Sequence, residues 1–378
     1  METASPNRAI HTEKTERNKF FGTWLGEKRD LLVLWLTAKL TGVMIALMYS
    51  VKRKKRMSHD NGISGIGTVH MVENQSFPPH EFFAPGKSYP IRIRHASATF
   101  LDDAMNCIRS MSVKFSHEEF RSPFDLEMNT GPIGLFWSAA SFLQFAALRK
   151  QDYGIEYKDY YRKYPEGLVG AQVSLRRNPF SFTNLQFYCQ TPFLYKGTDG
   201  LKRYAKYRVI PFDDEPETGI QTDMSEWDTC NQRILPDEAR GRNYLKYEYV
   251  DRINQYGAKY RFQLQVHPSS EPDDPEVFNC MKLWDEHLYP WNDLGIIHIT
   301  KVLSWEDSCR SSFSVGNMPK TLGILPAKSL YDYNSLNYLR MHAEVARKWR
   351  LFRYKFGGPP PPVPDNDNRN QGDWEQPS

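Results

Sequence analysis

Side chains capable of chemistry are scattered along the chain, and no short motif joins them into a recognisable site. The sequence has no Walker A pattern, no dinucleotide-binding fingerprint, no GxSxG elbow and no HExxH helix. Asp102 and Asp103 offer two carboxylates, but adjacent residues of a strand point to opposite faces, which favours solvated surface acids. His95 ends a strand pattern, where a single histidine is more often structural than catalytic. The segment Asn129–Gly131 has the composition of a turn. Taken singly, these residues leave the function open.

The composition predicts a folded protein whose positive charge is concentrated at one end. Of 378 residues, 40% are hydrophobic and 14% aromatic, which argues against disorder of the whole chain. Residues 1–57 hold twelve Lys or Arg and five Asp or Glu, so the net charge of +4 leaves the remaining body slightly acidic. A nucleic-acid enzyme is expected to carry positive charge on its body, so we expect no nucleic-acid partner.

The five cysteines indicate a reducing compartment. They are dispersed without a CxxC pair, which predicts reduced thiols rather than disulfides or a zinc site. We therefore expect a cytoplasmic setting. The five residues are Cys107, Cys189, Cys230, Cys280 and Cys309.

A long apolar run near the N-terminus predicts contact with a membrane. Residues 31–51 are apolar almost throughout, and the basic cluster Lys52–Arg56 follows directly. The run is long enough to span a bilayer. Lys39 lies near its middle, however, and a charge there costs roughly 2.5–3.5 kcal/mol on insertion. We expect an amphipathic or buried helix that packs on the domain or lies at a membrane surface, with a true span as the alternative.

Alternating polar and apolar residues predict an antiparallel barrel or sandwich with helical insertions. The alternation is clear over 89–94 and over 260–267. Shorter strand patterns are found at 113–115, 206–210 and 295–299. Helical patterns occupy 132–148 and 335–356.

Composition divides the chain into three parts. Residues 1–57 form a basic N-terminal segment that contains the apolar helix 31–51. Residues 58–356 form the main domain, entered through a Gly-rich linker over 58–68. Residues 357–378 are Pro-rich and polar, which predicts a disordered tail.

Three segments, in this order, resemble the haem-binding segments of catalases. Arg92–Ala96 resembles the strand that carries the distal histidine. Arg109–Phe115, with Phe124–Leu126 and Asn129, resembles the run that ends at the distal asparagine. Tyr333, with Arg340 seven residues later, resembles the proximal tyrosine helix.

The resemblance is most specific to the catalase-related allene oxide synthases of corals, known as the haem half of fusions with a lipoxygenase. It runs from about Gly62 to about Arg350. The segments that carry it are Phe77–Phe83, Met128–Gly131 and Ala327–Ser335. It implies an α+β fold, namely a catalase-like antiparallel β-barrel with helical insertions and a C-terminal proximal haem helix. It also implies haem b with ferric iron.

The resemblance assigns roles to individual residues. Tyr333 would be the axial metal ligand, because a tyrosinate oxygen is a hard anionic ligand for ferric iron. On the distal side His95 would accept and return a proton, and Asn129 would orient the peroxide oxygen. The implied cofactor-binding residues are Arg92 at a propionate, Phe142 and Phe145 against the distal face, and Arg340 at the tyrosinate or a propionate.

Two positions depart from the catalase pattern. Catalases place an arginine four residues before the axial tyrosine, where this chain has Ser329. They place a small apolar residue before the distal histidine, where this chain has Arg94. The second departure argues against hydrogen peroxide as the substrate.

The expected function is haem-dependent conversion of polyunsaturated fatty-acid hydroperoxides by cleavage of the O–O bond, as in a hydroperoxide dehydratase or lyase. The expected partners are a lipid hydroperoxide substrate and, through the basic N-terminal segment, a membrane surface; an oligomer stays open. Two alternatives stay open as well. One is a catalase or peroxidase acting on hydrogen peroxide, and the other is a non-enzymatic haem-binding protein on the same scaffold.

Overall fold

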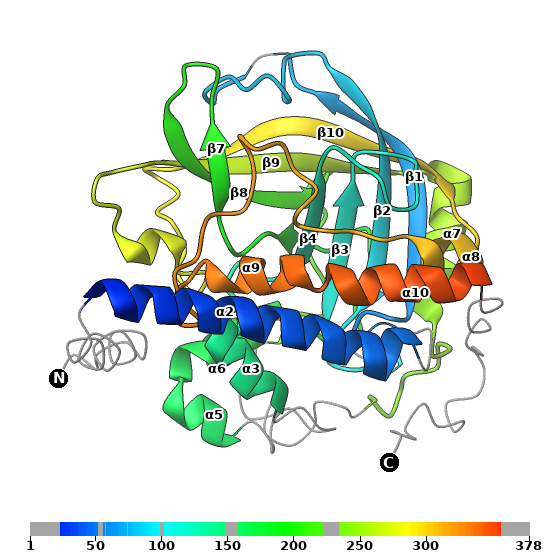
Figure 1. The fold of residues 1–378 in the computed structure, drawn as a ribbon. Coiled ribbons are helices and arrows are strands. Elements are labelled where there is room, and N and C mark those ends of the chain that lie inside the picture. Colours follow the sequence, from blue (N-terminus) through cyan, green and yellow to red (C-terminus); the bar gives the residue numbers. More distant parts are fainter. Residues whose placement is uncertain are drawn as a thin grey trace.

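Eight strands close into an antiparallel β-barrel (Figure 1). The computed structural model describes residues 23–51, 56, 58–73, 75–98, 102–147, 158–221 and 234–356. Within these, the barrel order is β2–β1–β10–β9–β8–β6–β4–β3, and β3 pairs with β2 to complete the circle. The barrel strands are β1 (Gly62–Met71), β2 (Ser88–Ser97), β3 (Cys107–Lys114), β4 (Asp125–Thr130), β6 (Phe187–Tyr188), β8 (Lys202–Pro211), β9 (Ala258–Pro268) and β10 (Trp291–Val302). Two short strands lie beside it, β5 (Leu175–Arg176) on β3 and β7 (Phe193–Lys196) on β8. The predicted catalase-like barrel is confirmed.

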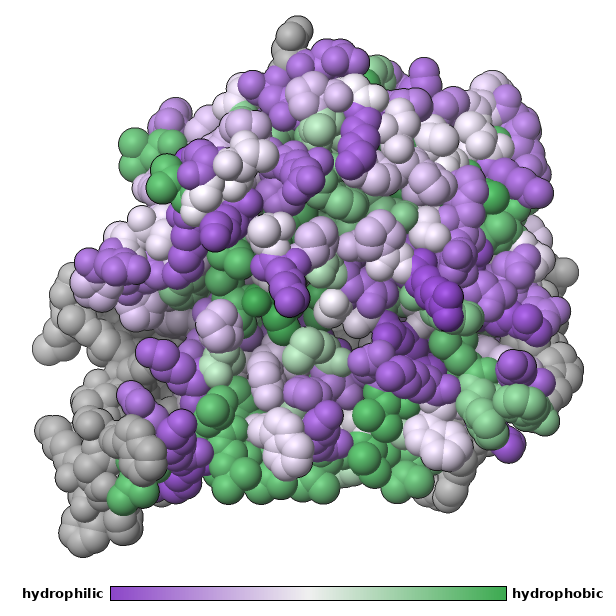
Figure 2. Space-filling model, turned by 45° about the horizontal axis from the view of Figure 1, so that its top comes forward, coloured by the Kyte–Doolittle hydropathy of each residue, from purple (hydrophilic) through white to green (hydrophobic). Residues whose placement is uncertain are grey.

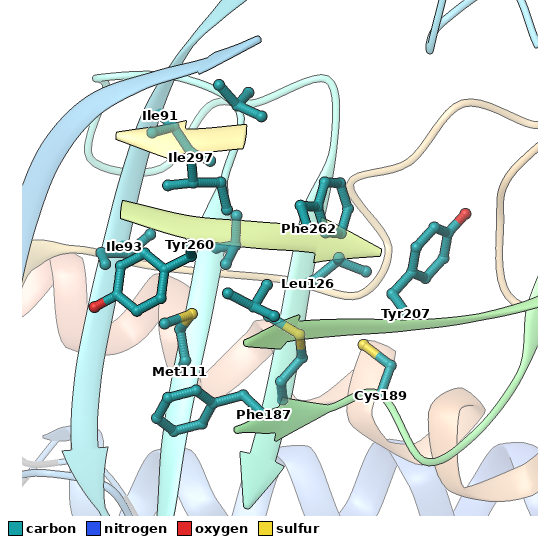
Figure 3. Packing of buried hydrophobic residues seen from close by; sticks show 14 of the residues in the cluster. Ile91, Ile93, Met111, Leu126, Phe187, Cys189, Tyr207, Tyr260, Phe262 and Ile297 are labelled. Carbon is teal, nitrogen blue, oxygen red and sulfur yellow. The ribbon is translucent and has the colours of Figure 1, made fainter. Parts of the chain in front are cut away.

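The barrel interior is an apolar and aromatic core (Figure 3). Every second residue of each strand points inward, because side chains alternate between the two faces of a strand. Ile91 and Ile93 of β2, for example, meet Tyr260 and Phe262 of β9 in this core. A barrel of this kind has no open edge, and its interior is filled by side chains.

Helices cover one end and one side of the barrel. Figure 1 shows α9 and α10 along the lower side of the barrel, with α2 beside them. The helices are α2 (Thr23–Ile45), continued by the π-helical turn η1 (Ala46–Val51), α3 (Ala139–Ala147), α5 (Lys158–Lys163), α6 (Pro165–Ser174), α7 (Tyr244–Tyr256), the 3₁₀ turn η2 (Pro275–Phe278), α8 (Trp305–Arg310), α9 (Ser335–His342) and α10 (Glu344–Phe356). The predicted tail over 357–378 lies outside the described residues.

The sequence located most strands but misplaced several boundaries. The Gly-rich segment 58–68, predicted as a linker, is mostly β1, whose glycines allow close approach of neighbouring strands: a Cβ on Gly67 would lie 1.8 Å from the His298 carbonyl oxygen. The helix predicted over 132–148 begins only at Ala139. The helix predicted over 335–356 is two helices that meet at Ala343.

The adjacent acids Asp102 and Asp103 are buried, so the prediction of solvated surface residues was wrong. Both Asp103 carboxylate oxygens accept from the Lys246 ammonium, at 2.8 and 2.7 Å. Asp102 accepts from the backbone N–H of Ala104 at 2.9 Å. The four described cysteines are all buried: Cys107, Cys189, Cys280 and Cys309.

Candidate functional site

A cavity of about 370 Å³ lies between the outer face of the barrel and the helices beside it. Strands β3 and β4 form one wall, and α9, α10 and the end of α2 form the other. Its apolar lining consists of Ile45, Met128, Phe136, Phe142, Leu336 and Leu339. Five arginines also line it: Arg56, Arg94, Arg340, Arg347 and Arg350.

Of the predicted site residues, Asn129 and Phe142 line this cavity. Asn129 lies on β4, opposite Ser110 of β3, which also lines the cavity. Phe142 lies on α3, and its ring centroid is 5.0 Å from that of Phe136. The two residues thus bring an amide and an aromatic wall together.

His95 lies inside the barrel and does not line the cavity. The cause is strand geometry: Arg94 lines the cavity, and the next residue of a strand points to the opposite face. The imidazole stacks on Phe182, with ring centroids 5.1 Å apart, and its Nε2 lies 3.3 Å from the Tyr260 hydroxyl. Burial, and secondarily the positive charge of Arg94, lower the pKa of His95 to about 3. The imidazole is therefore neutral at physiological pH, but it is enclosed by core side chains.

Tyr333 also lies outside the cavity lining. It precedes α9 and is buried among aromatic side chains. Its hydroxyl donates to the Glu276 carboxylate at 2.7 Å and accepts from the Asn279 amide at 3.4 Å. Burial tends to raise the pKa of Glu276, but hydrogen bonds from Lys282, Tyr333 and Asn279 outweigh it, so that the pKa is lowered. The partner of the phenol is thus an ionised carboxylate rather than the cation that a tyrosinate needs.

Arg340 lines the cavity but binds a carboxylate of the barrel. Its Nη2 lies 2.8 Å from Glu127 Oε2, and its Nη1 donates to the Asn337 side chain at 3.0 Å. The sequence suggested that Tyr333 and Arg340 lie two turns apart on one helix. In the structure α9 begins only at Ser335, so Tyr333 precedes the helix that carries Arg340.

Arg92 and Phe145 occupy other surroundings. Arg92 donates to the Ser311 hydroxyl at 2.9 Å and to the His117 carbonyl. Phe145 packs in the second aromatic cluster, with its ring centroid 5.4 Å from that of Tyr160. Neither residue lines the cavity. Of the seven predicted site residues, Asn129, Phe142 and Arg340 are brought together there.

Four arginines of the cavity wall were missed by sequence reasoning: Arg56, Arg94, Arg347 and Arg350. Arg94, Arg350 and Arg56 donate to the carbonyls of Ser308, Cys309 and Ser311 respectively, at the C-terminal end of α8. Burial, followed by the nearby Arg56 guanidinium, lowers the pKa of Arg350 to about 10, and the same two causes lower the pKa of Arg94. The basic residues around 52–56 and 347–355 were the available signal. The result is an electropositive wall suited to a carboxylate.

The site residues fit a haem only in part. The catalase-like fold implies this group, and an apolar cavity bounded by arginines is suited to a flat group with acidic edges. The predicted axial ligand does not fit as placed, because the Tyr333 hydroxyl is engaged with Glu276. The predicted distal base does not fit either, because His95 faces the barrel interior.

The closed barrel and its flanking helices define a protein of the catalase-like class. The chain matches the solved structure of a bacterial catalase with a TM-score of 0.59 at 15% sequence identity, over 79% of this chain and 59% of that one. At this identity the match shows the fold alone. No protein-family model matches the chain.

Sequence comparison relates the chain to part of a larger protein. The allene oxide synthase-lipoxygenase protein of Plexaura homomalla is 36% identical over 302 residues, which are 79% of this chain and 28% of that protein. The linolenate 9R-lipoxygenase of Nostoc sp. is 26% identical over 324 residues, which are 82% of this chain and 40% of that protein. The chain thus spans less than half the length of either relative. It has a catalase-like fold and is homologous to part of the allene oxide synthase-lipoxygenase protein.

Proposed function

We propose that this protein is a haem-dependent enzyme that converts polyunsaturated fatty-acid hydroperoxides, in the manner of an allene oxide synthase or related hydroperoxide dehydratase. The observation that carries the proposal is the 36% identity to the allene oxide synthase-lipoxygenase protein over 79% of this chain. Cleavage of an O–O bond is chemistry that a bound haem supplies. The protein contributes binding, orientation and exclusion of water.

The cavity supports a long amphiphilic substrate. Its apolar lining suits an acyl chain, and the positive charge of the arginines, which suits the acidic edges of a haem, would also attract the carboxylate at the chain end. In this proposal the Asn129 amide, which lines the cavity, donates a hydrogen bond to a peroxide oxygen.

In this proposal Tyr333 is the axial ligand that the resemblance to catalases implies, which requires its hydroxyl to exchange Glu276 for the iron. Tyr333→Phe should abolish retention of haem, because it removes the proposed anionic oxygen ligand while preserving the ring that packs in the core. The measurement is the ratio of haem absorbance to protein in the purified variants. Tyr331→Phe, two residues earlier, is the matched control and should retain haem. Equal haem content and an unchanged Soret band in Tyr333→Phe would contradict the assignment.

A further inference from the structure

One narrow stripe of α2 is buried against the rest of the protein. The stripe recurs at every fourth residue, which is the spacing of one ridge of a helix. It comprises Gly26, Leu34, Ala38, Gly42 and Ala46, with Asp30 half-buried between the first two. Its small residues permit close packing: a Cβ on Gly42 would lie 2.6 Å from the His342 carbonyl oxygen at the end of α9. Helix α2 is thus docked along its length.

The remaining circumference of α2 is apolar and exposed. In the most apolar 18-residue window of Leu25–Met48, mean hydropathy is 2.0 and only 22% of the residues are buried, so this is not a core helix. Figure 2 shows hydrophobic side chains gathered along the lower edge of the molecule, where α2 lies in Figure 1. The exposed large apolar residues of this segment are Leu25, Leu31, Leu32, Val33, Trp35, Leu36, Leu40, Val43, Met44, Leu47 and Met48.

Helix α10, which packs against η1 and α2, adds an exposed aromatic row. Trp349, Phe352 and Phe356 are spaced as neighbours on one helix face, and their successive ring centroids are 5.6 and 4.8 Å apart. We call the exposed side chains of α2 and this aromatic row the apolar face. Exposed apolar side chains in this number, on two helices that pack together, mark an interaction site.

Positive charge borders the apolar face. Arg353 and Lys355 lie in the last turn of α10, beside the aromatic row. In the sequence, Lys52–Arg56 follows directly after η1. Acidic residues are also present, but Glu344 is paired with Arg347 and Lys348. Basic residues beside an apolar surface, as Arg353 and Lys355 are here, are complementary to anionic lipid headgroups.

We propose that the apolar face inserts into one leaflet of an anionic bilayer, with α2 lying in the plane of the membrane and not crossing it. A transmembrane orientation would require α2 to separate from the surface on which it packs, which would expose the buried Leu34 and Ala38. It would also remove Thr41, Gly42 and Ile45 from the cavity wall. In-plane insertion keeps these contacts and buries only side chains that are already exposed.

This orientation gives the cavity an approach from the lipid phase. Thr41, Gly42 and Ile45 of α2 line the cavity on one side of the helix, while its exposed side belongs to the apolar face. A lipid of the bound leaflet is thereby brought within one helix diameter of the cavity. Membrane binding itself requires neither haem nor turnover, so its test is independent of the proposed function.

The test is flotation of the purified full-length protein with sealed vesicles. Binding should be strong on phosphatidylcholine vesicles that contain phosphatidylserine and weaker on phosphatidylcholine alone. Leu36→Glu/Leu40→Glu should weaken partitioning roughly 100-fold, since it removes two exposed leucines of the apolar face and adds negative charge. Leu201→Glu/Leu288→Glu changes two exposed leucines outside α2 and α10, one before β8 and one before β10, and should bind as the wild type does. Equal binding of both double variants would overturn the proposal.

Topology is decided on the same vesicles. A tag at the N-terminus should remain open to added protease after binding, because an in-plane helix leaves both ends outside. Protection of that tag would mean that α2 spans the bilayer, and the proposal would be wrong. A second result would also contradict the proposal: the protein binds neither vesicle type and forms a dimer that Leu36→Glu/Leu40→Glu dissociates. In that case a second copy of the chain would cover the apolar face.

Discussion

His95→Phe should remove a large part of the acid sensitivity of this protein. The folded protein holds the pKa of His95 at about 3, against an ordinary value near 6.5, because the imidazole is buried. Between these values the unfolded chain binds a proton that the folded protein does not bind. The wild type should therefore lose about 1.4 kcal/mol of unfolding free energy per pH unit from this residue as the pH falls from 6.5 toward 3. Above pH 6.5 the imidazole is neutral in both the folded and the unfolded chain, so His95 causes no loss of unfolding free energy there.

Chemical denaturation at a series of pH values measures the effect. The His95→Phe curve should be flatter on the acid side, since phenylalanine does not titrate and suits the surrounding aromatic rings. Tyr260→Phe is the matched control, because it removes the hydrogen bond to His95 and leaves the imidazole in place. It should keep the wild-type slope. A His95→Phe curve parallel to that of the wild type would show that His95 is not buried in its neutral form.

The same variant tests the catalytic role predicted for His95, which the structure does not test. A general base is typically worth about 10²–10⁴-fold in rate. A loss of that size with haem still bound would support catalysis and would require His95 to reach the cavity. Retained turnover together with the flattened acid slope would assign His95 to the barrel core.

Lys114→Met should destabilise the barrel by about 3–5 kcal/mol, the usual result of leaving one partner of a buried ion pair alone. The Lys114 ammonium lies 3.0 Å from Asp125 Oδ2, and both side chains are 0% exposed. Asp125 also accepts from the Ser314 N–H at 3.0 Å and the Asn317 amide at 2.8 Å, which ties β4 to the segment before α9. Burial raises the pKa of Asp125 and lowers that of Lys114, each opposed by the other residue.

The double variant Lys114→Met/Asp125→Asn is the control for the lost charge. It should recover much of the stability, because no unpaired charge is buried and the amide oxygen can still accept from Ser314. The loss of unfolding free energy in Lys114→Met should also become smaller as the pH falls. The reason is that the buried Asp125 carboxylate, whose pKa is raised, becomes protonated and leaves no buried charge. A single variant as stable as the wild type in urea would contradict the role given to this pair.

The strands were predictable because their alternation is local. In β9, for example, the alternation over 260–267 lies within a strand that runs from Ala258 to Pro268. Helix ends were less predictable because they depend on distant contacts. The backbone N–H of Ala139 donates to the Ser335 hydroxyl at 2.8 Å, a partner almost two hundred residues away. The buried Asp103 was missed for the same reason, since its partner Lys246 lies on α7.

The site was predictable only where a segment resembles the catalase pattern and its side chains face the cavity. Asn129, Phe142 and Arg340 meet both conditions. For His95 the resemblance identified a position on β2 but not the face to which its side chain points. The pairing of Tyr333 with Glu276 joins positions 57 residues apart and has no counterpart in any short motif.

The most direct test of the proposed function is a comparison of two substrates on the purified, haem-loaded wild-type protein. A polyunsaturated fatty-acid hydroperoxide and hydrogen peroxide are supplied separately at equal concentration. We expect rapid loss of the conjugated-diene absorbance of the lipid, with ketols as hydrolysis products, and little oxygen from hydrogen peroxide. Fast evolution of oxygen with the diene untouched would identify a catalase instead. Consumption of neither substrate would contradict an enzymatic function for this catalase-like chain.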